Sequence, residues 1–83
     1  MAIEHLRISD GFVRGSLLRG FETEEWEAPV PNEVRTLLIQ NRICGDYYAE
    51  AATKTGHLVS GFGQFPVDAI THAMSKLQAS NAR

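Results

Sequence analysis

The clearest structural signal in the sequence is the stretch Tyr47–Leu77, which reads YYAEAATKTGHLVSGFGQFPVDAITHAMSKL. Its first part predicts two strands, Tyr47–Thr53 and His57–Gln64, with Lys54–Gly56 as a tight connection between them. One face of such a hairpin has to be covered by another element of secondary structure. The residues that follow the hairpin in this stretch can form that element.

A helix is predicted to follow the hairpin and to pack against it. Gly61 and Gly63 lie two residues apart and so point to one face of the strand, which leaves room there for a closely packed backbone. Pro66 suits the first turn of a helix, and Asp68 complements the helix dipole. Apolar residues then recur at helical spacing; they are Val67, Ile70, Met74 and Leu77.

The N-terminal part of the chain predicts three further strands. Ile3–Ile8 and Phe12–Arg19 form the first two, and Ser9–Gly11 supplies the turn chemistry between them. Phe21–Glu27 alternates Thr and Glu side chains in a way that suits a third strand, exposed along much of its length. Its glutamates would also discourage edge-to-edge pairing with another sheet.

The middle of the chain has two competing interpretations. The prolines of Ala28–Pro31 end the third strand because proline lacks the N–H donor. Asn32 can cap a short helix over Val34–Arg42, which we favour. A strand over Val34–Ile39 is the alternative, because Leu37, Leu38 and Ile39 are consecutive apolar residues that leave no polar side. The fold expected is α+β, with one small antiparallel sheet of about four to five strands, a C-terminal amphipathic helix and a short middle helix.

Length and composition predict a single domain over residues 1–83. A chain of this size buries only roughly 60% of the surface that its unfolded form exposes, so its core is thin. One cysteine excludes an internal disulfide, and a homodimer or a complex with a partner is the expected source of further stability. Neither a secretory signal nor a membrane-length apolar run is visible, and a lone cysteine suits a reducing compartment, which predicts a cytoplasmic protein without membrane contact.

Four glutamates surround the single tryptophan in Glu22-Thr23-Glu24-Glu25-Trp26-Glu27, which we call the acidic tract. Charges of one sign packed this closely repel each other, so they persist most easily where water or a basic partner faces them. A solvated face is the plain interpretation of such a run, and Trp26 could equally fill a thin core. The functional interpretation is contact with a groove lined by arginine and lysine.

Patterns for catalysis or metal binding are missing from the sequence. His5, His57 and His72 are far apart, and none forms a pair with ligand spacing. Cys44 is expected to be a small buried apolar residue rather than a nucleophile. We therefore predict a protein that is not an enzyme and that has no metal and no cofactor.

The hairpin-then-helix segment resembles a unit found in HicB-like antitoxins, in which a strand ends in Gly-x-Gly and a helix opens soon afterwards with Ala-Ile. The resemblance covers about residues 47–77, and the matching residues are Gly61, Gly63, Pro66, Ala69 and Ile70. In size and acidic character the chain is also similar to small phage-encoded inhibitors of the anti-CRISPR type. These resemblances imply a small protein that acts by binding another protein.

Two function classes follow. The leading hypothesis is a non-enzymatic inhibitor or modulator that docks on a larger protein with a basic nucleic-acid-binding groove. Its contact residues are then Glu22, Glu24, Glu25, Trp26, Glu27, Tyr47 and Tyr48. The alternative is a small dimeric nucleic-acid-binding regulator or antitoxin, in which two copies of Arg7, Arg14 and Arg19 form a basic patch. A net charge of −2 makes nucleic acid the less favoured partner.

Overall fold

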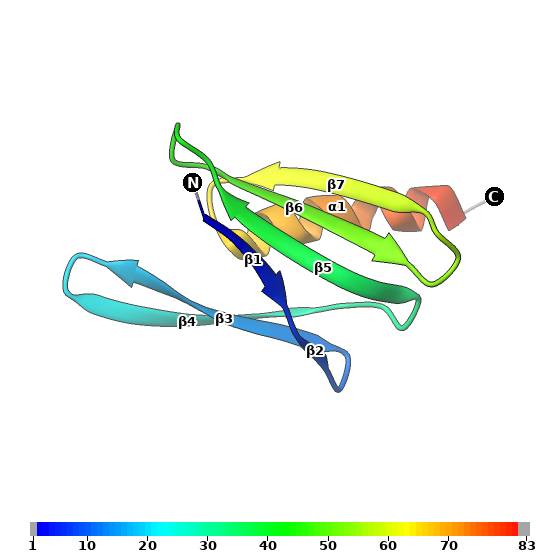
Figure 1. Cartoon of the computed structure of the whole chain (residues 1–83), viewed down its shortest axis with the longest axis horizontal. Coiled ribbons are helices and arrows are strands. Elements are labelled where there is room, and N and C mark those ends of the chain that lie inside the picture. Colours follow the sequence, from blue (N-terminus) through cyan, green and yellow to red (C-terminus); the bar gives the residue numbers. More distant parts are fainter. Residues whose placement is uncertain (1, 82–83) are drawn as a thin grey trace.

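A computed structural model describes residues 2–81 of the chain, apart from the side chains of Ala2, Arg19 and residues 78–81. Within this range the chain forms seven strands followed by one helix (Figure 1). In chain order these are β1 (Ala2–Leu6), β2 (Ile8–Ser9), β3 (Phe12–Arg19), β4 (Glu22–Pro29), β5 (Val34–Asn41), β6 (Tyr47–Thr53), β7 (Leu58–Gly63) and α1 (Pro66–Asn81). The predicted α+β class is confirmed.

The described strands form two antiparallel sheets instead of the single sheet that the sequence predicted. One sheet has four strands in the order β1-β5-β6-β7, and the other has three in the order β2-β3-β4. In Figure 1, α1 lies behind the four-stranded sheet, while β3 and β4 form a long hairpin that passes below this sheet and extends beyond its end. The molecule is therefore elongated, with extents of 45 × 27 × 18 Å.

The predicted first strand, Ile3–Ile8, is divided between the two sheets. β1 pairs with β5, whereas β2 pairs with β3, and the chain passes from one sheet to the other at Arg7. The predicted turn before β3 is present, with φ angles of 55° at Asp10 and 81° at Gly11. Two successive positive φ angles favour Asp-Gly in a tight hairpin, which explains this dipeptide.

The predicted middle helix over Val34–Arg42 is wrong, because these residues form β5, as the competing interpretation had it. β5 lies between β1 and β6, and both of its faces are at least partly covered. Leu37 and Ile39 belong to the buried core, whereas Leu38 alternates to the opposite face and is half-buried. A central strand with apolar residues on both faces has the same local pattern as a buried helix, which caused the error.

Helix α1 packs on a face of the four-stranded sheet that small residues line. Ala49 and Ala51 of β6 are fully buried there. A Cβ atom added to Gly61 would lie 2.6 Å from the carbonyl oxygen of Ala69, and one added to Gly63 would lie 2.7 Å from the Ala69 backbone nitrogen. Both distances are too short for real Cβ contacts. The predicted close approach of helix and strand at these two glycines is therefore confirmed.

Replacing Leu37 with alanine should destabilise the protein much more than the same change at Leu38. Leu37 is 1% exposed, and its truncation would leave a cavity that costs about 2–4 kcal/mol of unfolding free energy. For the half-buried Leu38 we expect a loss of about 1 kcal/mol or less. Urea unfolding of the two variants measures the difference. Equal losses would contradict the alternation of β5.

Candidate docking surface

The acidic tract lies on β4, which is one of the two edge strands of the three-stranded sheet over the described residues. Its side chains alternate between two faces, as the sequence predicted: Glu22, Glu24 and Trp26 share one, and Thr23, Glu25 and Glu27 share the other. We call residues 16–25, the part of the β3–β4 hairpin beyond the Gly15–Trp26 pair, the arm. The tract is thus part of an ordered hairpin whose far end extends beyond the four-stranded sheet (Figure 1).

The outer face of the hairpin carries a cross-strand ion pair. Arg14 and Glu27 are register partners, and Nε of Arg14 donates a hydrogen bond of 2.6 Å to Oε2 of Glu27. This hydrogen bond, together with the charge of Glu27, raises the pKa of the Arg14 guanidinium above its usual value. Both side chains are largely exposed. Part of the negative charge of the tract is therefore balanced within the hairpin itself.

The inner face of the hairpin holds Trp26 over Gly15. A Cβ atom at Gly15 would lie 2.7 Å from Cε2 of the indole, so only glycine leaves the ring this position. Trp26 is half-buried and packs against the hydrophobic core. An aromatic ring laid across a glycine on the neighbouring strand shields that backbone and fixes the pairing. The two interpretations of Trp26 therefore combine, since the ring contacts the core and also lines the surface described next.

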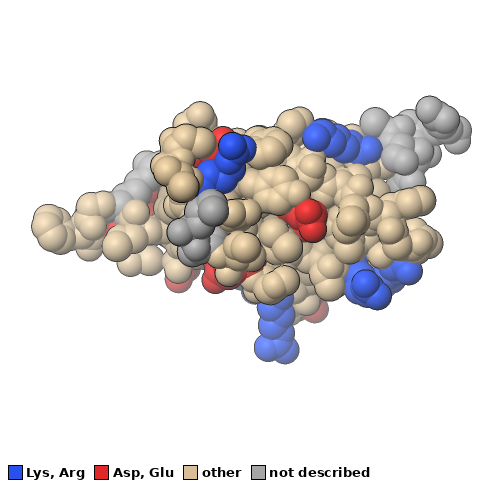
Figure 2. Space-filling model, turned by 45° about the horizontal axis from the view of Figure 1, so that its top comes forward, with Lys and Arg blue, Asp and Glu red and all other residues tan. Residues whose placement is uncertain are grey.

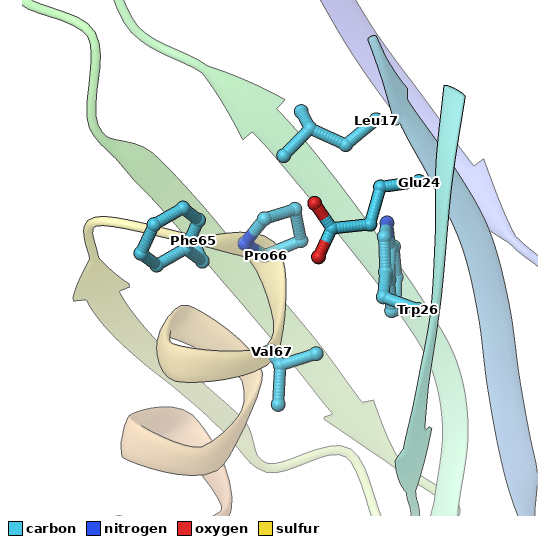
Figure 3. Close-up of a pocket in the computed structure, with 6 residues that line it drawn as sticks. All are labelled: Leu17, Glu24, Trp26, Phe65, Pro66 and Val67. Carbon is cyan, nitrogen blue, oxygen red and sulfur yellow. The ribbon is translucent and has the colours of Figure 1, made fainter. Parts of the chain in front are cut away.

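A groove separates the arm from the start of α1. It has a volume of about 190 Å³ and is lined by Leu17, Glu24 and Trp26 from the hairpin and by Phe65, Pro66 and Val67 from the other side. We call it the arm groove. Figure 3 shows the Glu24 carboxylate pointing across it toward Pro66, beside the indole of Trp26. The walls are otherwise apolar. The groove therefore combines an aromatic face, apolar walls and one carboxylate.

The two tyrosines of the predicted contact set lie on opposite faces of β6. Tyr47 lines a second hollow that adjoins the arm groove and shares Leu17, Trp26 and Pro66 with it. Tyr48 lies on the face away from α1, where its ring centroid is 5.1 Å from that of Phe62. The structure therefore brings Tyr47, but not Tyr48, together with Trp26 and the acidic tract.

The end of the arm exposes two large apolar side chains. Leu18 is 70% exposed, and Phe21, in the turn between β3 and β4, is fully exposed. Apolar residues at the tip of a projecting hairpin contribute nothing to the core, and only contact with another molecule would bury them. The pattern Leu-Leu-Arg-Gly-Phe around a turn signals this exposed apolar tip, which was not predicted from the sequence.

Of the three arginines of the alternative hypothesis, the structure describes the side chains of Arg7 and Arg14. Arg14 is engaged by Glu27, and Arg7 is exposed at the crossing between the sheets; the side chain of Arg19 lies outside the described part. Figure 2 shows lysine and arginine side chains dispersed over the visible face rather than gathered in a stripe. The ion pair with Glu27 offsets part of the positive charge that the alternative hypothesis assigns to Arg14.

Two side chains of interest for chemistry lie elsewhere. His72 is exposed on α1, and its Nδ1 accepts a hydrogen bond of 3.1 Å from the backbone N–H of Phe62. Cys44 is exposed rather than buried, which corrects the prediction, because it lies in the loop between β5 and β6; its thiol donates to the Asp46 carboxylate at 3.0 Å. Among the described residues, no group of three His, Cys, Asp or Glu side chains is placed to hold a metal ion.

The hydrogen bond between Tyr48 and Glu50 provides a test of the geometry of the four-stranded sheet on its face away from α1, which we call the open face. The Tyr48 hydroxyl donates a hydrogen bond of 2.7 Å to Oε2 of Glu50, which raises the pKa of Tyr48, because ionisation would lose this bond beside a carboxylate. Since the folded-state pKa is the higher one, the pair stabilises the protein below about pH 10, and the contribution is lost as the pH rises through the Tyr48 pKa.

Glu50→Gln should therefore move the ionisation of Tyr48 to lower pH. The measurement is the ultraviolet absorbance of tyrosinate during an alkaline titration, made in a Tyr47→Phe background so that only one tyrosine contributes. An ionisation curve that does not move would show that the carboxylate is not the cause.

Comparison of the chain with protein-family models, with curated proteins and with solved structures finds no significant match. Over the described residues, the structure contains no helix with the length and apolar character that crossing a membrane requires. The geometry and charge of the surface are therefore the only guides to the function of this protein.

Proposed function

We propose that the protein is a non-enzymatic binding module that inhibits or modulates a larger protein by docking its acidic arm on a basic groove of that partner. The observation that carries the proposal is the position of the acidic tract on the edge strand of a projecting hairpin. A solvated face needs no such projection, whereas a hairpin that stands out from the body can enter a concave surface.

The composition of the arm supports a protein partner with a basic surface. Carboxylates on both faces of β4 attract basic side chains from either side, and complementary charge speeds encounter and selects the partner. The exposed tip residues Leu18 and Phe21 add apolar area that can be buried once the arm has docked. A groove that normally holds nucleic acid combines positive charge with concave shape, and is the partner surface that this arm fits best.

Capture of partners with matched charge variants tests the proposal. In the arm variant, Glu22, Glu24, Glu25 and Glu27 are all changed to glutamine. In the control variant, Asp10 and Asp68 become asparagine while Glu33 and Glu50 become glutamine, which gives the same net charge. The two variants and the natural chain are used as bait in lysate of the source cells.

We expect the control variant to retain the partners of the natural chain and the arm variant to lose those with basic surfaces. Circular dichroism checks that both variants are folded. Retention of the same partners at the same strength by the arm variant would exclude the acidic tract as the contact.

A further inference from the structure

One side of β3 is open where the hairpin projects. β2 pairs with Phe12 and Val13, and beyond them, from Arg14 to Arg19, β4 is the one strand that pairs with β3 among the described strands. β1 lies near β3 beside β2 but separates from it toward the arm, because β1 pairs with β5 instead (Figure 1). This side of β3 can therefore accept another strand.

The main chain of Ser16 and Leu18 points to the open side. Bonded and non-bonded residue pairs alternate along an antiparallel ladder. The N–H of Val30 donates to the carbonyl oxygen of Gly11 at 2.8 Å, so the odd-numbered residues of β3 bond to β4 and the even-numbered ones face away from it. Ser16 and Leu18 are exposed, and each offers an N–H and a C=O. We call this side of Ser16–Leu18 the free edge.

Space for an added strand lies between β1 and the free edge. The hollow that Tyr47 lines has a volume of about 210 Å³, and β3 contributes Ser16–Leu18 to it. Another hollow, of about 500 Å³, adjoins it and is lined by Arg14–Ser16. Glu4 of β1 lines both hollows. The wall of the first is largely apolar; it includes Leu17, Trp26, Ile39, Tyr47 and Pro66.

Two other strand edges are protected against an added strand. The residues of β4 that face away from β3 include Glu25 and Glu27, and Pro29 lacks an N–H. Charged residues and proline at an edge disfavour further pairing. On β7, a side chain of α1 already accepts the N–H of Phe62. The free edge carries neither a carboxylate nor a proline, and the side chain of Arg14 is held by Glu27 on β4.

We propose that the free edge of β3 binds an extended segment of a partner protein as an added antiparallel strand. The main chain of this segment bonds to that of Ser16 and Leu18, which supplies affinity, and its alternate side chains supply specificity. The side chain opposite Leu17 points into the hollow that Tyr47 lines, so an apolar residue is favoured there. The inference goes beyond the proposed function, because main-chain pairing does not involve the carboxylates of the acidic tract.

A neutral peptide serves as the probe. It is the capped pentapeptide Thr-Val-Thr-Val-Thr, titrated into the natural protein while the fluorescence of Trp26 is recorded; Trp26 is the single tryptophan and lines both hollows. In the proposed pairing, the N–H groups of the threonines face β3 and those of the valines face away. One derivative is N-methylated at its first and third residues, and another at its second and fourth.

We expect saturable binding of the unmodified probe. Methylation of the two threonines should weaken binding at least about tenfold, because two main-chain donors to the free edge are lost. Methylation of the two valines should change the affinity by no more than about threefold, because their N–H groups make no bond to β3.

Two proline variants assign the edge. Ser16→Pro removes a donor from the free edge without removing a hydrogen bond to β4, so probe binding should weaken at least about tenfold. Thr23→Pro is the matched control, because Thr23 faces the opposite edge of the hairpin, and it should leave probe binding unchanged. Circular dichroism checks that both variants are folded. In the natural protein, amide hydrogen exchange at Ser16 and Leu18 should slow when the probe is bound, which requires no substitution.

Three results would overturn the proposal: equal affinities for the two methylated peptides, unchanged exchange at Ser16 and Leu18, or no saturable change at millimolar probe. Weaker binding by Thr23→Pro but not by Ser16→Pro would place the added strand on β4 and also contradict it. Self-association of the natural chain that Ser16→Pro abolishes would assign the free edge to a second copy instead. Because the probe is uncharged, failure here is distinguishable from failure of the proposed function.

Discussion

Replacing Gly61 with alanine should cost about 3 kcal/mol of unfolding free energy. The added Cβ would lie 2.6 Å from the carbonyl oxygen of Ala69 and closer still to the backbone nitrogen of Ala73. Both are backbone atoms of α1, so the clash cannot be relieved by turning a side chain. The helix would have to move away from β7, and the contacts of the buried core would open with it.

Ser60→Ala is the matched control for Gly61→Ala. Ser60 is the preceding residue of β7 and alternates to the face away from α1, so we expect a change within about 1 kcal/mol. Urea unfolding followed by circular dichroism gives both values. A small domain has a total stability of only about 5–10 kcal/mol, so Gly61→Ala should also lower the melting temperature visibly. Similar stabilities for the two variants would contradict the close packing of α1 on β7.

Reversing the charge of the acidic tract should give the largest effect on function. With Glu22, Glu24, Glu25 and Glu27 all changed to lysine, the rate of association with a captured basic partner should fall by about 100-fold at low ionic strength, because attraction becomes repulsion. The difference should shrink as salt is added, since exposed charges are screened over roughly 10 Å at about 0.1 M salt. Stopped-flow mixing at several salt concentrations measures both effects.

The control for the reversal carries lysine at Asp10, Glu33, Glu50 and Asp68, which lie outside the tract and give the same net charge. We expect its association rate to fall by much less, about threefold to tenfold, through the change in overall charge. Equal rates for the two lysine variants would mean that net charge controls the encounter and that the arm has no special role.

The parts of the fold that local sequence determines were predicted well. Residues that are close together in the chain determine the strand Tyr47–Thr53, the turn at Gly56 and the start of α1 at Pro66. Each of these elements can therefore be recognised from its own sequence. The two-sheet arrangement depends on pairing between β1 and β5, from Leu6 with Leu37 to Ala2 with Asn41, which are 31 to 39 residues apart, and nothing near Arg7 marks the crossing. The prediction of a middle helix was wrong because β5 is a central strand with apolar residues on both faces. Its sequence therefore does not show the alternation of polar and apolar residues that identifies a strand.

The candidate site was predicted in part for the same reason. The acidic tract was expected to be an exposed edge strand, and β4 is one. The arm groove was missed because it joins Trp26 to Phe65–Val67, which are about forty residues away in the chain. A strand glycine such as Gly15 often marks a close approach, but its register partner Trp26 could be identified only once the strands were paired.

Amide hydrogen exchange of the protein, alone and with a captured partner, tests the central claim most directly. If the arm docks on a basic groove, slower exchange on binding should be concentrated in residues 16–27 and at the start of α1 around Val67. The open face of the four-stranded sheet, reported by Tyr48 and Phe62, should exchange at the same rate in both states. Slower exchange confined to β6 and β7, with the arm unchanged, would contradict the account.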